Sequence, residues 1–139
     1  RAEPACPFSF SHHKAGFPYQ KVAFSFVLSN SKNKKVFHEG HSPNIREIKS
    51  KNIKSDVAIL TAESVRFLGL INLSMNSKNT LKTLKLLGSE RLMVTGTKPY
   101  LIEGVINKLL SIDTIDLSKI KLKGVDIKFE GGDKFNLKE

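Results

Sequence analysis

The sequence predicts an α/β (or α+β) domain whose helices pack on one mixed sheet. Alternating apolar residues from Lys21 to Phe37 indicate an N-terminal β-hairpin. Apolar residues spaced three and four apart indicate helices after Asn76 and after Pro99. Short alternating segments near the C-terminus indicate one or two more strands. The expected order is therefore a hairpin, then β-α-β-α, then the C-terminal strand or strands.

The first part of the chain divides into an arm and a hairpin. Residues 1–20 contain three prolines without sustained periodicity, which predicts an irregular N-terminal arm, and residues 21–139 are expected to form a single basic α/β domain. Residues 29–35 (SNSKNKK) are typical of a turn, and Val36 begins the expected return strand. The apolar residues of the outgoing strand are Val22, Phe24, Phe26 and Leu28.

The middle of the chain is less regular. Residues 38–55 are polar and basic, and only Ile45, Ile48 and Ile53 could anchor them to a core. Residues 57–60 (VAIL) are apolar and short, which favours a buried strand. The stretch from Glu63 to Met75 matches both a period of two and a helical period, so its conformation stays open.

Two helices have recognisable ends. Asn76 or Ser77 can cap the first, and Gly88 stands where it should stop. A strand at 92–94 then ends at Gly96, and a second helix follows with Pro99 in its first turn. Residues 120–129 alternate across a glycine, which indicates two short strands or one bulged strand.

The charge points to an anionic partner. Lys and Arg total 23 against 13 Asp and Glu, which gives a net charge of +10 and a pI near 9.8. Self-repulsion of this size is commonly relieved by nucleic acid, although biased residue usage is an alternative explanation. The basic residues are spread over several elements, which favours a protein packed in a ribonucleoprotein. The predicted nucleic-acid-binding residues are Lys32, Lys34, Lys35, Arg46, Lys49, Lys51, Lys54, Lys78, Lys82, Lys85 and Lys98.

Motifs for catalysis or metal binding are weak. The single Cys6 cannot form an internal disulfide, and one Cys with scattered histidines matches structural zinc poorly. No G-x-S-x-G elbow is present, and the turn from Gly96 to Pro99 could at most hold one phosphate. We therefore expect no enzyme, no metal, no cofactor and no small-molecule substrate. The four histidines are His12, His13, His38 and His41.

One family resemblance supports RNA binding. The hairpin from Phe24 to Phe37, with Asn30 in its turn, and the segment from Leu92 to Leu109 together resemble the ribosomal protein S-eleven family and, more loosely, the L-eighteen family. The resemblance covers about two thirds of the chain and implies ribosomal RNA binding through the hairpin turn and the Gly96 turn. The Arg- and Pro-rich C-terminal tail of that family is missing here, replaced by residues 124–139.

A second resemblance is to STAS domains. Residues 86–120 (LLGSERLMVTGTKPYLIEGVINKLLSIDTIDLSKI) are similar to the late strand-helix portion of that family. The resemblance implies docking to other proteins, often switched by a phosphorylated Ser or Thr. Residues 67–69, where that switch would fall, contain neither.

The leading hypothesis is a non-catalytic RNA-binding component of a ribosome or similar particle, with RNA and neighbouring proteins as partners. The alternatives are a STAS-like interaction domain and an exported β-rich binder of an anionic lipid or polysaccharide. The start at Arg1 suits an imported or exported protein, with a mitochondrial ribosome favoured. No apolar run approaches the ~20 residues that span a bilayer.

Overall fold

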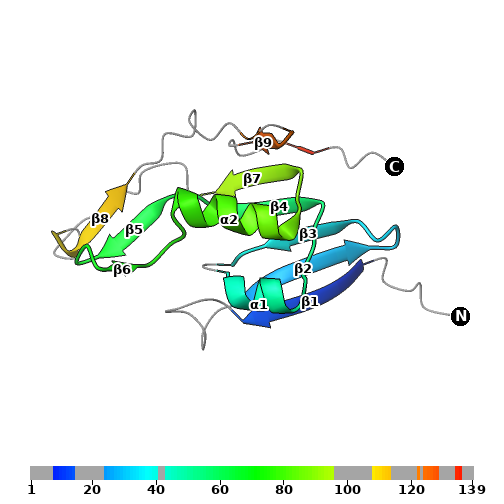
Figure 1. Cartoon of the computed structure of the whole chain (residues 1–139), viewed down its shortest axis with the longest axis horizontal. Helices are drawn as coiled ribbons and strands as arrows, with labels where there is room; N and C mark the ends of the chain where they lie inside the picture. Colours follow the sequence, from blue (N-terminus) through cyan, green and yellow to red (C-terminus); the bar gives the residue numbers. More distant parts are fainter. Residues whose placement is uncertain are drawn as a thin grey trace, which may run out of the picture.

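The computed structural model describes residues 8–14, 24–40, 43–95, 108–113, 122, 124–128 and 134–135. Its main feature is a six-stranded sheet with strand order β1-β2-β3-β4-β7-β9, accompanied by a three-stranded sheet with order β6-β5-β8 (Figure 1). The predicted α/β class with helices on a mixed sheet is confirmed. Within the described part of the chain, no helix is long and apolar enough to cross a membrane.

The predicted hairpin is confirmed. Strands β2 (Phe24–Asn30) and β3 (Lys35–His38) pair antiparallel, with Val27 opposite Phe37. The side chain of Asn30 closes the turn by accepting hydrogen bonds from the backbone N–H groups of Lys32 and Lys34 at 3.1 and 2.8 Å. Asparagine is a common turn residue because its side chain can bond to the backbone two residues further on.

The second half of the sheet is parallel. β3 pairs with β4 (Val57–Thr61), β4 with β7 (Arg91–Thr95), and β7 with β9 (Asp126–Lys128). The buried strand predicted at 57–60 and the strand predicted at 92–94 are both confirmed. Three of the parallel strands therefore end at the same edge of the sheet, which is where binding sites of open α/β sheets usually lie.

Helix α2 (Ser77–Leu87) follows the predicted signals. The side chain of Asn76 caps it by accepting from Asn79 N at 2.9 Å, and Gly88 ends it with a left-handed backbone at φ 68°. Leu84 and Leu87 are buried, while the three lysines of the helix are exposed.

Helix α1 (Ile45–Ser50) was not predicted. It occupies the polar stretch 38–55, where one turn of helix buries only Ile48. Asn44 caps it by accepting from Glu47 N at 3.2 Å. Six residues are too few to establish a helical period, so the cap is the only local signal.

Both helices cover the same face of the six-stranded sheet (Figure 1). The strand registers place Val27, Phe37, Ala58 and Leu92 in one row across that face. Phe37, Ala58 and Leu92 are 0% exposed, and they pack in one core with residues from both helices. The helix residues of this core are Ile48, Leu84 and Leu87.

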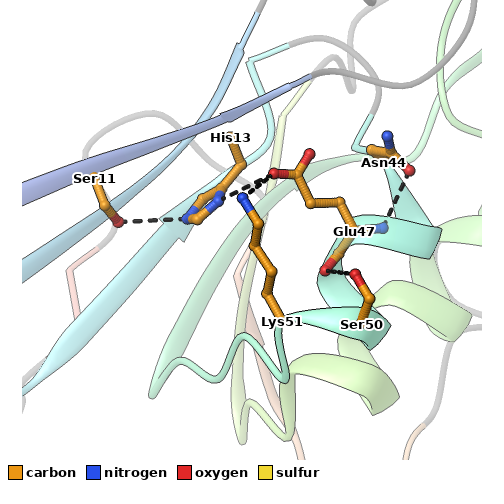
Figure 2. A network of polar contacts seen from close by, with 6 residues as sticks. All are labelled: Ser11, His13, Asn44, Glu47, Ser50 and Lys51. Atoms are coloured by element: carbon orange, nitrogen blue, oxygen red, sulfur yellow. Dashed lines mark hydrogen bonds and ion pairs between the residues drawn. The ribbon is translucent and has the colours of Figure 1, made fainter.

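The prediction of an irregular arm over residues 1–20 is wrong for residues 8–14. These residues form β1 (Phe8–Lys14), which pairs antiparallel with β2. His13 reaches from β1 to Glu47 on α1, with 3.6 Å between Nδ1 and Oε1, and Lys51 Nζ lies 2.6 Å from the same oxygen (Figure 2). The strand is thus held by pairing and by an ion-pair contact, neither of which a local pattern reveals. The boundary between arm and domain stays a prediction.

The ambiguous stretch from 63 to 75 forms strands. β5 (Ser64–Phe67) pairs with β6 (Ile71–Asn72) and with β8 (Leu110–Asp113). The Gly96 turn, Cys6 and His41 lie outside the described residues, as does the predicted helix after Pro99 except for residues 108 and 109, which directly precede β8. Of the C-terminal strands predicted at 120–129, the described residues include β9.

Candidate functional site at the carboxyl edge of the sheet

The candidate site lies where β3, β4 and β7 end together. Glu39 directly follows β3, Thr61 ends β4 and Thr95 ends β7. Parallel pairing aligns these ends, because Thr61 is the register partner of Thr95 and His38 is the partner of Ile59. Polar side chains from three strands are therefore brought together at one edge.

Glu39 is the most unusual residue of this edge. It is 2% exposed, and its Oε1 accepts a 2.5 Å hydrogen bond from the backbone N–H of Thr61. Its Oε2 is buried without a hydrogen-bond partner among the described residues. Burial raises the pKa of Glu39 to about 8, and hydrogen bonding from Thr61 opposes that rise. At neutral pH the side chain is therefore an uncharged carboxylic acid.

The backbone around Glu39 is firmly held. Its N–H donates to Ile59 O at 3.2 Å, and its carbonyl accepts from the hydroxyl of Ser25 at 2.9 Å. The next residue, Gly40, has φ +71°, and a Cβ built there would lie 2.0 Å from Phe24 O. Only glycine fits this position without a shift of the neighbouring strand.

Two threonine hydroxyls lie together at this edge, where β4 and β7 end. Thr61 Oγ1 and Thr95 Oγ1 are 3.2 Å apart, and both residues are partly exposed. The carbonyl of Thr61 accepts from the hydroxyl of Thr80 on α2 at 2.8 Å. Thr61 is therefore fixed from both sides, by Glu39 at its N–H and by Thr80 at its carbonyl, while its own hydroxyl faces Thr95.

A second buried acid follows β4. Glu63 is 6% exposed, and burial raises its pKa. Ser64 is 3% exposed, and its hydroxyl has no hydrogen-bond partner among the described residues. Buried polar atoms without partners are uncommon in folded proteins and often mark a site for a water or a ligand. His38, on the other side of Glu39, accepts from Gly40 N through Nδ1, and desolvation lowers its pKa.

The predicted basic residues that the structure describes do not belong to this edge. Lys34 Nζ lies 3.7 Å from Asp56 Oδ1, Lys51 pairs with Glu47, and Lys54 Nζ donates to Leu86 O at 2.8 Å. Lys98 lies outside the described residues. Lys32 and Lys35 lie at the hairpin turn and the start of β3. The exposed basic residues of the two helices are Arg46, Lys49, Lys78, Lys82 and Lys85.

Sequence reasoning did not find the edge residues. Glu39 stands between two histidines in a polar stretch, and only its pairing with β4 buries it. The sequence contains only two weak signals of this site. Glu39 and Gly40 directly follow a strand, and Thr61 ends the next strand.

Comparisons with solved structures identify the fold. The metallo-β-lactamase fold protein YhfI from Bacillus subtilis matches 92% of this chain with a TM-score of 0.57 and 14% identity. A proposed Zn-dependent hydrolase of the metallo-β-lactamase superfamily from Thermotoga maritima matches 88% with a TM-score of 0.58 and 11% identity. Igni18, a metallo hydrolase from Ignicoccus hospitalis, matches 96% with a TM-score of 0.61 and 15% identity. The shared feature is the fold.

The match is partial and restricted to structure. The chain covers 49%, 64% and 55% of those three proteins, respectively. No family model and no curated protein matches the sequence. At these identities the likeness establishes the fold and leaves activity to be tested.

The comparisons overturn the sequence-based assignment. Two of these neighbours are described by the metallo-β-lactamase fold or superfamily and the third as a metallo hydrolase, and none of the three is described as a ribosomal protein or a STAS domain. The resemblances failed because they were based on apolar periodicity and a few glycines and asparagines, which many α/β proteins share. The RNA-binding, ribosomal and mitochondrial-ribosome hypothesis, its two alternatives, and the expectation that the chain is not an enzyme are therefore withdrawn.

The descriptions of two neighbours imply a metal, so we tested whether this chain fits one. Among the described residues, no group of three or more His, Cys, Asp or Glu side chains could hold a metal ion. The carboxyl edge instead carries a buried acid and threonine hydroxyls, and a hydroxyl is a weak choice for zinc. The described residues do not fit a zinc centre.

Proposed function

We propose that this chain is part of a hydrolase, with the carboxyl edge of β3, β4 and β7 as its substrate-binding site. Its support is the fold shared with proteins described as hydrolases, together with one observation at the edge. That observation is the pair of hydroxyls of Thr61 and Thr95, two partly exposed residues, which lie 3.2 Å apart while the buried acid Glu39 holds the N–H of Thr61.

The two hydroxyls are suited to bind an oxygen that gains negative charge. In hydrolysis of an ester or a phosphodiester, water adds to the carbonyl carbon or the phosphorus, and the bond to the leaving oxygen breaks. Donors already fixed at the oxygen that gains charge lower the barrier, because no reorganisation is needed during the reaction. Thr61 and Thr95 would supply such donors, one from each of two neighbouring strands, once the hydrogen bond between them is exchanged for bonds to the substrate oxygen.

Glu39 acts as a positioning residue in this proposal. It is too buried to contact substrate, but its Oε1 holds the backbone N–H of Thr61. While the acid is uncharged, this hydrogen bond needs no counterion. Ionisation would leave a buried charge without a described counterion, which is costly, so the charged side chain would move toward solvent and release the N–H of Thr61. Activity should therefore fall as pH rises through the pKa of Glu39, about 8.

The test uses the purified chain with three chromogenic probes: p-nitrophenyl acetate, bis(p-nitrophenyl) phosphate and nitrocefin. Each is measured from pH 6 to 9.5, with and without added Zn²⁺, because one neighbour is described as Zn-dependent. Thr61→Val and Thr95→Val should each lower kcat/KM by about 100-fold. Thr83→Val is the matched control, because Thr83 is a buried threonine within α2.

Glu39→Gln distinguishes positioning from direct proton transfer. Glutamine keeps an oxygen for Thr61 N–H and resembles the uncharged acid, so the variant should keep its activity at pH 7 and lose the decline above pH 8. Loss of activity at all pH values in a folded Glu39→Gln protein would show instead that Glu39 transfers a proton. Absence of hydrolysis of all three probes by the wild-type chain would count against the proposed function.

A further inference from the structure

The three-stranded sheet ends in an exposed apolar tip. Four of the six exposed large hydrophobic residues in the described part of the chain make up this tip: Leu68, Leu70, Ile71 and Leu109. The turn between β5 and β6 and the first residue of β6 supply three of them, and Leu68 N donates to Leu109 O at 2.7 Å, which joins the fourth. Leu70 is 85% exposed, and the three-stranded sheet lies at one end of the molecule (Figure 1).

Leu68 has an unfavourable backbone conformation. Its φ is +52°, in the left-handed region that disfavours a bulky side chain. The other non-glycine residues with positive φ in the described chain are Asn33 and Asn52, and asparagine tolerates this region. Leu68 is 56% exposed, so little burial within the chain offsets the strain. Strained positions are often found at binding sites, which indicates that this leucine makes a contact outside the chain.

The charged residues of the segments that form the tip are all positive. Residues 64–73 and 106–112 include Arg66 and Lys108 and contain no aspartate or glutamate. Lys108 is exposed, and the strand register places Asp113 at the opposite end of β8 from the tip. Basic side chains beside an apolar protrusion suit a lipid surface, because their stems cover apolar groups while their charges reach the headgroups.

We infer that the apolar tip inserts into the surface of a phospholipid bilayer. Binding of a protein to a bilayer surface increases with the apolar area buried at the boundary of headgroups and acyl chains, and with the attraction of basic residues to acidic headgroups. A protein partner would need a concave apolar site to bury a side chain as exposed as Leu70, whereas lipid adapts to a convex tip. Large exposed apolar groups rimmed by polar residues are typical of such contact sites.

The experiment is co-sedimentation of the chain with vesicles of equimolar phosphatidylcholine and phosphatidylglycerol. The wild-type chain should bind, and Leu70→Ser should lower the partition coefficient by about 10-fold, because the lipid then buries less apolar area. Leu68→Asn should also weaken binding but should stabilise the fold, because asparagine tolerates a φ of +52°. Weaker binding of this variant therefore does not arise from unfolding, which urea titration checks.

Two variants elsewhere in the chain are matched controls. Leu28→Ser removes a leucine that is 41% exposed on β2, and Lys82→Gln removes an exposed charge from α2. Both should bind as the wild type does. If the net charge of +10 alone caused binding, Lys82→Gln would weaken it and the two tip variants would not.

Three results would overturn the inference. The first is a wild-type chain that stays in the supernatant, and the second is equal binding by the wild type, Leu70→Ser and Leu68→Asn. The third is self-association that Leu70→Ser abolishes, without binding to vesicles, which would make a second copy the partner of the tip. Hydrolysis is not measured, so the outcome is separate from the proposed function.

Discussion

Two glutamates eight residues apart illustrate opposite ways of holding a carboxyl group. Glu47 on α1 lies against Lys51 and His13, and the hydrogen bond from Lys51 and the nearby positive charges keep its pKa below the ordinary value (Figure 2). Glu39 is buried at the carboxyl edge, where its pKa rises to about 8, and no described cation pairs with it.

This difference in surroundings indicates that Glu47 has a structural role and that Glu39 is a candidate functional residue. The Glu47 network ties β1 to α1 and compensates the charge that it contains. No described cation pairs with the carboxyl group of Glu39. Folded proteins seldom bury such a group away from a functional site. Stability measurements can test this contrast, because the two acids should respond to pH with opposite signs.

The largest expected effect is at Gly40, which fixes the chain next to Glu39. Gly40→Ala places a Cβ 2.0 Å from Phe24 O and imposes φ +71° on alanine, so the free energy of unfolding should fall by more than about 2 kcal/mol. Gly69→Ala is the control, since Gly69 has φ +68° with nothing within 4 Å and should cost only about 1 kcal/mol. Urea unfolding followed by circular dichroism measures both. Equal losses would show that the close approach to Phe24 has no energetic consequence.

The next effect is the pH dependence contributed by Glu39. Its pKa is higher in the folded chain than the ordinary value of 4.5, so its contribution to stability is complete below that value and is lost as pH rises through about 8. Wild-type stability should therefore fall relative to Glu39→Gln as the pH rises from 5 to 8. Glu90→Gln, at an exposed glutamate, should parallel the wild type. A constant difference between wild type and Glu39→Gln would contradict the raised pKa.

The smallest effect is at Glu47, and it has the opposite sign. Its pKa is lowered in the folded chain, so its contribution is present above the ordinary value of 4.5 and is lost as pH falls through the folded pKa. Glu47→Gln should lower stability by about 0.5 kcal/mol at pH 7, and the difference should shrink as the pH falls through the folded pKa. Lys51→Met should cause a similar loss, and the double variant no more than one of them. Additive losses would show that the contact between the two side chains contributes nothing.

Elements with a complete local signal could be predicted from the sequence. Helix α2 has a capping Asn76, an apolar face and a terminal Gly88, and it was predicted within its observed bounds. The β2–β3 hairpin was equally clear, because its strands alternate and Asn30 marks its turn. These signals act over a few residues, so no tertiary contact is needed to read them.

The remaining features depend on contacts distant in sequence. Strand β1 needs its partner β2 and the contact between His13 and Glu47, and α1 is too short to show a period. The candidate site arises only when parallel pairing aligns Glu39, Thr61 and Thr95. The charge of the chain, which dominated the sequence-based prediction of RNA binding, says nothing about fold.

The protonation state of Glu39 is the most direct test of the account. Carboxyl ¹³C NMR of a glutamate-labelled chain, with the Glu39 signal assigned by its absence in Glu39→Gln, gives this pKa without any assumption about activity. The account predicts a titration midpoint near pH 8, with the side chain uncharged at neutral pH. A midpoint near 4.5 would show that Glu39 is an ordinary carboxylate and would remove the basis for its role at the edge.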